Sequence, residues 1–242
     1  WIPKEKILTT NVWSSELSKL ASNAMLAQRI SSINSLSALC EKTGADIEEL
    51  SKAIGMDRRI GPKFLNASVG FGGSCFQKDI LNLVYLCRHY GLEEVAEYWH
   101  QVVKINDYQK YRFTQKIIDS FNGSLIGQSV TILGWAFKAN TNDSRQSPAI
   151  TVATNLLKAG LTLHVYDPKV AKRRIMEDIK NKLETVTNLH VWDSPEEALK
   201  PTRTVAVLTA WEVLTSLDFT NHKLFNGTLL DLGVYQYYNI GK

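Results

Sequence analysis

The sequence predicts an α/β protein in two parts, an all-helical part over residues 1–121 and a doubly wound parallel sheet over residues 122–242. Three observations predict this division. Before residue 121, apolar residues recur at intervals of three and four, which is typical of helices. After residue 128, short β-rich runs alternate with helical segments, which is typical of a parallel sheet covered by helices. Between the two parts, Asn122-Gly123 has the composition of a turn.

Four helices are predicted in the first part, over residues 14–40, 46–54, 77–90 and 93–121. Ser14 or Ser15 is expected to cap the first helix, and Gly44 is expected to end it. Asp46 is placed to cap the second helix, and Gly55 to close it. The first helix is therefore expected to be long, at about 26 residues.

In the second part, strands are predicted over residues 129–135, 161–166, 188–192, 203–208 and 228–231, with helices over residues 148–159 and 195–199. Pro148 suits the first turn of a helix, and Gly160 is expected to stop that helix before the next strand. Because strand and helix alternate, we expect the strands to run parallel.

Composition and charge argue against several classes of protein. The net charge is +4 and the basic residues are scattered, apart from a Lys172-Arg173-Arg174 triplet that a solvated helix end explains, so we expect no nucleic-acid partner. No apolar run approaches the roughly 18 to 20 residues of a membrane span, so we expect no membrane partner and a cytoplasmic protein. Cys40, Cys75 and Cys87 form no CxxC pair and the five histidines show no ligand spacing, which predicts a reducing compartment and no metal site.

A glycine-rich stretch stands out before the third helix: Gly70-Phe71-Gly72-Gly73-Ser74-Cys75-Phe76-Gln77-Lys78-Asp79. Its glycines allow the backbone to approach a ligand closely. Cys75 lies where the loop becomes a helix, and the free amides and dipole of a helix start favour a thiolate. A buried, inert thiol is the alternative, and the residues alone leave both open for Cys75. Cys40 and Cys87 lie within helical segments and are expected to be inert.

Other polar residues are ambiguous when each is taken alone. Lys19 and Asn23 are four residues apart on one helix face, which by itself predicts a solvated surface. Lys138 and Arg145 follow the first predicted strand, at the edge where open α/β sheets bind ligands, and cations there suit a phosphate. Arg59 is typical of a surface cation. No G-x-G-x-x-G dinucleotide fingerprint occurs in the chain.

Four motifs occur in order: Asn11-Val12-Trp13-Ser14-Ser15-Glu16-Leu17-Ser18-Lys19-Leu20, then Ala27-Gln28-Arg29-Ile30-Ser31-Ser32-Ile33-Asn34, the glycine-rich stretch, and Leu133-Gly134-Trp135-Ala136-Phe137-Lys138. Together they resemble the UDP-glucose 6-dehydrogenases of the UDP-glucose/GDP-mannose dehydrogenase family. The resemblance is close before residue 121, looser from 129 to 170 and faint after 185. It implies a helical central domain with a long dimerisation helix and a Rossmann-like UDP-sugar-binding domain. It also implies that the chain is a fragment or processed form without the family's N-terminal NAD-binding domain.

The resemblance assigns chemical roles to four residues. Members of the family oxidise UDP-glucose to UDP-glucuronate in two NAD-dependent hydride steps. Cys75 would be the nucleophile that forms a thiohemiacetal and then a thioester. Lys19 would stabilise oxyanion charge, with Asn23 helping to hold the reacting sugar carbon. Asp79 would order or activate water.

Binding roles follow from the same resemblance. The implied substrate-binding residues are Arg59, Phe64, Leu65, Phe71, Gly72, Phe76, Phe137 and Lys138. Arg59 resembles an arginine that reaches the substrate of a neighbouring subunit. Lys78 and Arg145 are expected to contact the cofactor NAD. UDP-glucose and a second copy of the chain are the expected partners, the latter forming a homodimer through the long helix and leaving a hexamer open.

The chain departs from the family pattern at several positions. Asn66 stands where animal members commonly carry a substrate-binding lysine, and residues 139–142 replace a more charged stretch. The family usually carries an F-D-G-R motif near its end, whose arginine contacts the diphosphate. We align this motif with Leu230-Asp231-Leu232-Gly233-Val234, which lacks the arginine. Because nothing in the chain is expected to seat the nicotinamide, we expect the isolated chain to be inactive. A non-catalytic dimerising or UDP-sugar-binding module, and a related nucleotide-sugar dehydrogenase, are the alternatives.

Overall fold

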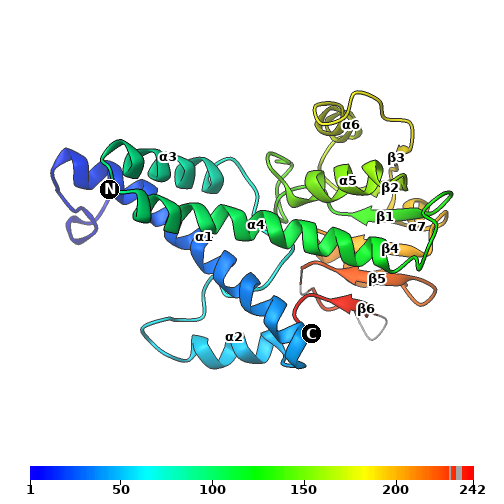
Figure 1. Ribbon diagram of the computed structural model, residues 1–242, viewed down its shortest axis with the longest axis horizontal. Helices are drawn as coiled ribbons and strands as arrows, with labels where there is room; N and C mark the ends of the chain where they lie inside the picture. The colour runs from blue at the N-terminus through cyan, green and yellow to red at the C-terminus, as the bar shows by residue number, and fades with distance from the viewer. Residues whose placement is uncertain (229, 233–235) are drawn as a thin grey trace.

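The computed structural model describes residues 1–228, 230–232 and 236–242. Its helical part consists of α1 (Val12–Thr43), α2 (Ile47–Gly55), α3 (Phe76–His89) and α4 (Glu93–Asp119), preceded by a short 3₁₀ turn at Lys4–Lys6. Helices α1, α3 and α4 pack on one another, and α4 continues from this layer along the sheet, as Figure 1 shows. The helical prediction for the first part is therefore confirmed.

The sheet contains β1 (Ser129–Leu133), β2 (Thr162–Tyr166), β3 (Leu189–Val191), β4 (Thr204–Val207), β5 (Lys223–Asn226) and β6 (Gln236–Asn239). Helices α5 (Pro148–Lys158), α6 (Lys172–Lys180) and α7 (Pro195–Leu199) connect strands, and a 3₁₀ turn at Glu212–Ser216 follows β4. All strands are parallel, in the order β3-β2-β1-β4-β5-β6. The winding reverses between β1 and β4, so a crevice is expected at their carboxyl ends. The doubly wound sheet is confirmed.

Capping explains where the first two helices begin. Asn11, rather than Ser14 or Ser15, caps α1, because the Asn11 side chain accepts a hydrogen bond from the Ser14 amide. Helix α1 is therefore 32 residues long and ends at Gly44, whose φ of 77° is left-handed as predicted. Asp46 caps α2 as predicted, by accepting from the amides of Glu48 and Glu49.

The strand predicted over residues 228–231 is wrong for the three of those residues that the structure describes, and residue 229 lies outside the described residues. The chain instead forms β5 at Lys223–Asn226 and β6 at Gln236–Asn239. Gly227 follows β5, and a side chain would not fit there because a Cβ would lie 2.9 Å from the Val207 carbonyl oxygen. The apolar run after Gly227 has the stronger β pattern in the sequence. The strand forms instead from Lys223–Asn226, before Gly227, which pairs with β4. The basic triplet at 172–174 begins α6.

One hydrophobic cluster extends from the helical layer into the sheet. Ile33 on α1 and Phe113 on α4 belong to the same buried cluster as the strand residues Ile132 and Phe225. The Phe113 and Phe225 rings meet edge to face, with centroids 6.5 Å apart. Helix α4 thus packs on both parts, and the domain boundary at residues 121–122 stays a prediction. Across the described ranges, no helix combines the length and apolarity needed to cross a bilayer.

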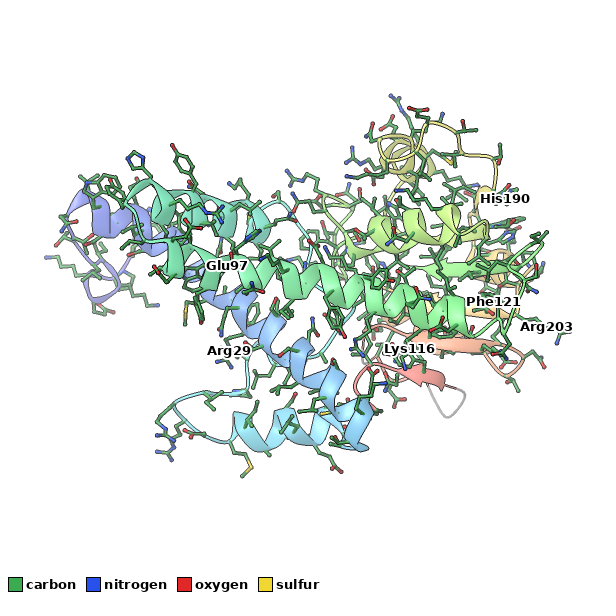
Figure 2. All side chains as sticks on the ribbon, in the orientation of Figure 1. Arg29, Glu97, Lys116, Phe121, His190 and Arg203 are labelled. Carbon is green, nitrogen blue, oxygen red and sulfur yellow. The ribbon has the colours of Figure 1, made fainter. Side chains whose placement is uncertain are left out.

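A buried ion pair fastens the end of the chain to the helical layer. Arg112 on α4 lies 2.6 Å from a carboxylate oxygen of Glu41 on α1, and both side chains are largely buried. Burial raises the pKa of Tyr238, whose hydroxyl donates to Glu41 at 2.7 Å. The amide of Gly241 donates to the same oxygen. Lys116, labelled on α4 in Figure 2, lies over the Tyr238 ring.

We expect Arg112→Met to lower the free energy of unfolding by about 3 kcal/mol, because it leaves the Glu41 carboxylate buried without its main partner. Urea unfolding followed by circular dichroism measures the change. Arg173→Met is the matched control, since Arg173 is exposed and pairs with Glu177 on the same helix. The control should leave the free energy of unfolding nearly unchanged. Equal effects for the two variants would contradict the structural role of the buried pair.

Candidate active site

The glycine loop, residues 64–75, runs along the carboxyl ends of the strands to the start of α3. A Cβ on Gly72 would lie 2.5 Å from the Gln146 carbonyl oxygen, and one on Gly73 would lie 3.0 Å from the Phe137 ring. The Gly73 amide, at a φ of 84°, donates to the Arg145 carbonyl at 2.8 Å. These two glycines therefore allow the loop following β1 to approach closely, in addition to any ligand.

Three buried carboxamides support the backbone of the glycine loop. Asn34 accepts from the amide of Ser68, and Gln109 donates to the carbonyl of Ser68, both at 2.8 Å. Asn106 accepts from the amide of Phe71 and donates to its carbonyl, at 2.8 and 3.1 Å. A buried loop without such partners would lose hydrogen bonds to water with no replacement. These side chains from α1 and α4 therefore hold the loop in its course.

Asp79 joins the predicted catalytic residues of two helices. The Asp79 carboxylate, 6% exposed, accepts from Lys19 at 2.9 Å and from Asn23 at 2.6 Å, across the contact between α1 and α3. Lys78 lies 3.4 Å from the other carboxylate oxygen. Burial by itself would raise the pKa of Asp79, but these hydrogen bonds outweigh burial and hold the pKa below its ordinary value. The carboxylate is therefore ionised at neutral pH.

Cys75 lies at the N-cap of α3, where the free amides of the first turn lie close to it. Its side chain is exposed, whereas Cys40 and Cys87 are buried. The amide of Asp79 donates to the Cys75 carbonyl, so the thiol and the Asp79 cluster lie one helical turn apart. The burial expected of an inert thiol is therefore found at Cys40 and Cys87 and not at Cys75.

A cavity of about 560 Å³ opens beside the glycine loop, between the helical layer and the carboxyl ends of β1 and β4. It is lined by Ile30, Phe64, Asn66, Ala67, Ser68, Val69, Gly70, Phe71, Gly72, Phe76, Phe137, Lys138, Ala139, Leu208, Thr209, Ala210 and Thr228. Lys138 is the one charged side chain in this described lining. The volume of the cavity falls within the range of small-molecule sites. The cavity also lies at the crevice expected where the winding of the sheet reverses.

Six of the predicted substrate-binding residues line this cavity: Phe64, Phe71, Gly72, Phe76, Phe137 and Lys138. Two do not. The Leu65 side chain is 6% exposed and is buried in the core that joins the helices to the sheet. Arg59 is exposed and pairs with Asp57 at 2.6 Å, outside the cavity lining.

The two residues predicted to contact a cofactor lie on the rim next to Cys75. Lys78 is exposed and follows Cys75 by one turn of α3. Arg145 makes a paired hydrogen bond with Asp143, which raises the pKa of the guanidinium and lowers that of the carboxyl. A negative charge on Cys75 would also raise the pKa of the Arg145 guanidinium, to a smaller extent than Asp143 does. Both cations are thus placed to meet an anionic group that approaches the thiol.

The sheet itself is not arranged to take a dinucleotide phosphate at the end of β1. The carboxylate of Asp167, at the end of β2, accepts from the backbone amides of Trp135 and Ala136, at 2.6 and 3.0 Å. It also accepts from the Trp211 indole. These amides are the ones that a fingerprint loop would offer to a phosphate, so here the carboxylate takes that position. Within the described residues, no group of three or more His, Cys, Asp or Glu side chains could hold a metal ion.

Thr228 is one of the cavity residues that the sequence analysis did not predict. Phe225-Asn226-Gly227-Thr228 at the end of β5 keeps the first and third residues of F-D-G-R, and Thr228 lines the cavity. This stretch fits the motif better than residues 230–234, of which 233 and 234 lie outside the described residues. Thr228 then stands in the place of the arginine. The F-x-G spacing was the signal that could have identified it.

Comparisons with known proteins agree with this geometry. The model of the UDP-glucose/GDP-mannose dehydrogenase central domain matches residues 13–108, and that of the family's UDP-binding domain matches residues 131–231. The UDP-glucose 6-dehydrogenase of Drosophila melanogaster is 54% identical over 227 residues, covering 90% of this chain and 47% of that protein. UDP-glucose 6-dehydrogenase 2 of Arabidopsis thaliana is 51% identical, covering 93% and 50%. The chain thus spans about half the length of these relatives.

Solved structures share the fold over nearly the whole chain. A UDP-glucose dehydrogenase from Pyrobaculum islandicum superposes with a TM-score of 0.84 at 30% identity, covering 94% of this chain and 51% of that one. A UDP-D-ManNAc dehydrogenase from Pyrococcus horikoshii has a TM-score of 0.75 at 20% identity, covering 96% and 53%. The second likeness concerns the fold alone.

Asp79→Asn is expected to lower the free energy of unfolding by about 1–3 kcal/mol at neutral pH, because its bonds to Lys19 and Lys78 lose their charge. The lowered pKa means that the ionised carboxylate stabilises the fold fully above the ordinary value of 3.8. This contribution is lost as the pH falls through the folded-state pKa. The difference from the parent in urea unfolding should therefore shrink below pH 3.8.

The control for this variant is Asp193→Asn, since Asp193 is 82% exposed and pairs with Lys172 on the surface. We expect a change under about 1 kcal/mol for the control. A destabilisation by Asp79→Asn that persists unchanged in acid would show that its charge is not the source.

Proposed function

This chain belongs to the UDP-glucose/GDP-mannose dehydrogenase family, and on that premise we propose that it supplies the nucleophile and the substrate site of an NAD-dependent UDP-glucose 6-dehydrogenase. The observation that carries the proposal is the arrangement around Asp79. A cation and a carboxamide from α1 meet this carboxylate one turn from an exposed cysteine at a helix start. A purely structural helix contact would not require the exposed thiol.

The nucleotide of the substrate is proposed to occupy the cavity between the glycine loop and the ends of β1 and β4. Lys138 places an ammonium in this lining, which suits a diphosphate. The phenylalanines of the lining offer apolar faces to the base and sugar. Because Phe76 lines the cavity and directly follows Cys75, a sugar attached to the diphosphate can extend toward the thiol.

In the proposed mechanism, the C6 alcohol of glucose loses a hydride and a proton and becomes an aldehyde. The Cys75 sulfur then adds to the aldehyde carbon, the aldehyde oxygen takes up a proton, and a thiohemiacetal forms. Loss of a second hydride from that carbon, together with the proton of its hydroxyl, yields a thioester. Water adds to the thioester, the carbon–sulfur bond breaks, and the products are the carboxylate and the free thiol. NAD, when bound, accepts the hydride in each oxidation.

Lys19 and Asn23 are proposed to stabilise the negative oxygen that develops on the reacting carbon. Each makes one hydrogen bond to Asp79. An ammonium has three N–H donors and a carboxamide has two, so both keep donors that can turn toward the substrate. Donors held in place before the reaction contribute mainly in the transition state. Asp79, being ionised, can accept a proton from the attacking water.

The cofactor contacts proposed here are peripheral to the sheet. Lys78 and Arg145 would hold an anionic part of NAD at the rim beside Cys75, because both present exposed cations there. The Asp167 carboxylate occupies the amides at the end of β1, so this sheet would not hold the dinucleotide at that loop. We therefore propose that the 242 residues alone do not complete the NAD site.

A homodimer through α1 is proposed as the working assembly. Apolar side chains are exposed along this helix, including Val12, Trp13, Met25 and Leu39. A second copy of the chain would remove this surface from water. By helical spacing, Met25 and Leu39 lie on the side of α1 away from Lys19 and Asn23.

We expect the 242-residue chain to bind UDP-glucose in calorimetry and to produce no NADH when NAD is added. Bound UDP-glucose should also slow the alkylation of Cys75 by iodoacetamide, because the sugar would cover the thiol. Mass spectrometry of the alkylated chain provides its own control, since Cys40 and Cys87 are buried and should stay unmodified.

Three results would contradict this proposal. Absence of binding heat at millimolar UDP-glucose would favour a dimerising module without a nucleotide site. Binding without protection of Cys75 would favour a UDP-sugar binder in which the thiol has no part. Rapid NADH production by the chain alone would show that it completes the NAD site after all.

Thr228→Arg is expected to tighten UDP binding about tenfold, because it adds a charge-assisted phosphate contact to a lining with one cation. Binding of uridine, which has no phosphate, should not change. Calorimetry with both ligands separates charge from packing. Thr228→Gln is the control of similar length without a charge, and an equal gain in that variant would contradict the electrostatic explanation.

A further inference from the structure

Arg29, in the middle of α1, makes an unusual set of contacts with the segment that precedes the glycine loop. Its guanidinium donates to the carbonyl of Ile60 at 2.9 Å and to that of Gly61 at 2.8 Å. A third bond goes to the carbonyl of Lys63, at 2.9 Å. Figure 2 labels Arg29 on the helix that carries it. One side chain thus engages three carbonyls within four residues.

These three carbonyls depend on Arg29. Among the residues that the structure describes, no backbone amide donates to Ile60, Gly61 or Lys63. The segment has a turn of its own, since the amides of Ile60 and Gly61 donate to the carbonyl of Asp57. The carbonyls of Ile60, Gly61 and Lys63 lie where a planar guanidinium with five N–H donors can bind all three.

The next residue along the chain shows why this matters for the cavity. Phe64 has a φ of 61°, a left-handed conformation that is unfavourable for a bulky residue. Such conformations persist where the surroundings hold them, and they cluster at binding sites. Phe64 lines the cavity, as does Asn66 two residues later. Ile30, which follows Arg29 on α1, lines the same cavity.

We propose that Arg29 is a positioning residue of the substrate site. By holding residues 60–63 against α1, it keeps Phe64 in place as a wall of the cavity, and it sets the affinity for the nucleotide without touching it. When a cavity wall is already held in place before the ligand arrives, less conformational entropy is lost on binding. The identity of the ligand as a uridine nucleotide rests on the proposed function.

The test compares Arg29→Gln and Arg29→Lys with the parent chain by three measurements: UDP affinity in calorimetry, thermal unfolding, and the rate of trypsin cleavage after Arg58, Arg59 and Lys63. We expect Arg29→Gln to weaken UDP binding about tenfold and to speed cleavage in this segment severalfold. Arg29→Lys should fall between the two, because its ammonium keeps the charge but cannot reach three separate carbonyls.

Arg88→Gln is the matched control. Arg88 is a half-exposed arginine on α3 that pairs with Glu93 at 3.0 Å, away from the cavity lining. This variant should keep the affinity for UDP and the parent rate of cleavage. A merely structural role for Arg29 would lower the unfolding temperature and leave the UDP affinity of the folded chain unchanged, which would overturn the proposal.

The remaining outcomes also decide the question. If Arg29→Lys matches the parent in both affinity and cleavage, the three-carbonyl geometry is not needed and the proposal fails. If Arg29→Gln does not fold, the lysine variant carries the comparison, with weaker UDP binding expected. If the parent binds no UDP, the proposed function fails, and the cleavage rates alone then decide whether Arg29 positions the segment.

Discussion

The backbone of the glycine loop passes along the strand ends largely out of contact with water, and its hydrogen bonds have to be made by protein groups. Asn34, Asn106 and Gln109 make several of them, from helices α1 and α4. Because the partners are side chains, the loop needs no strand ladder and can follow the shape of the cavity. Cys75 ends this loop, so the position of the thiol depends on carboxamides far away in the sequence.

Helix α1 connects the parts of the site through one face. Four residues recur on this face at helical intervals. Lys19 and Asn23 both bind Asp79. Ile30 lines the cavity, and Asn34 binds the glycine loop. Glu41, about two turns beyond Asn34, binds Arg112 and the end of the chain. A capped helix of 32 residues therefore sets the distances among the Asp79 cluster, the cavity and the sheet.

The sheet contributes a crevice of an altered kind, which we propose as the nucleotide site. Asp167 satisfies the amides at the end of β1, which removes the usual phosphate position there. The cavity lies instead between β1 and β4, and it extends to Thr228 after β5. A uridine diphosphate placed here would meet one cation, Lys138, so this chain relies on shape and apolar contact more than on charge. The parallel sheet and the helical layer are both required, because neither alone encloses this space.

The sequence by itself determined the elements with strong local signals. The helical periodicity of the first part, the capping by Asp46, the alternation of strand and helix, and the placement of Cys75 at a helix start all follow from neighbours within a few residues. What only the tertiary structure decided is which distant side chains meet. Lys19 and Asn23 alone predicted a solvated face, and the packing of α1 on α3 brought them to Asp79 across about sixty residues of chain. Strand β5 and Thr228 were missed for the same physical reason, because a short run becomes a strand only when a neighbouring strand supplies its hydrogen bonds.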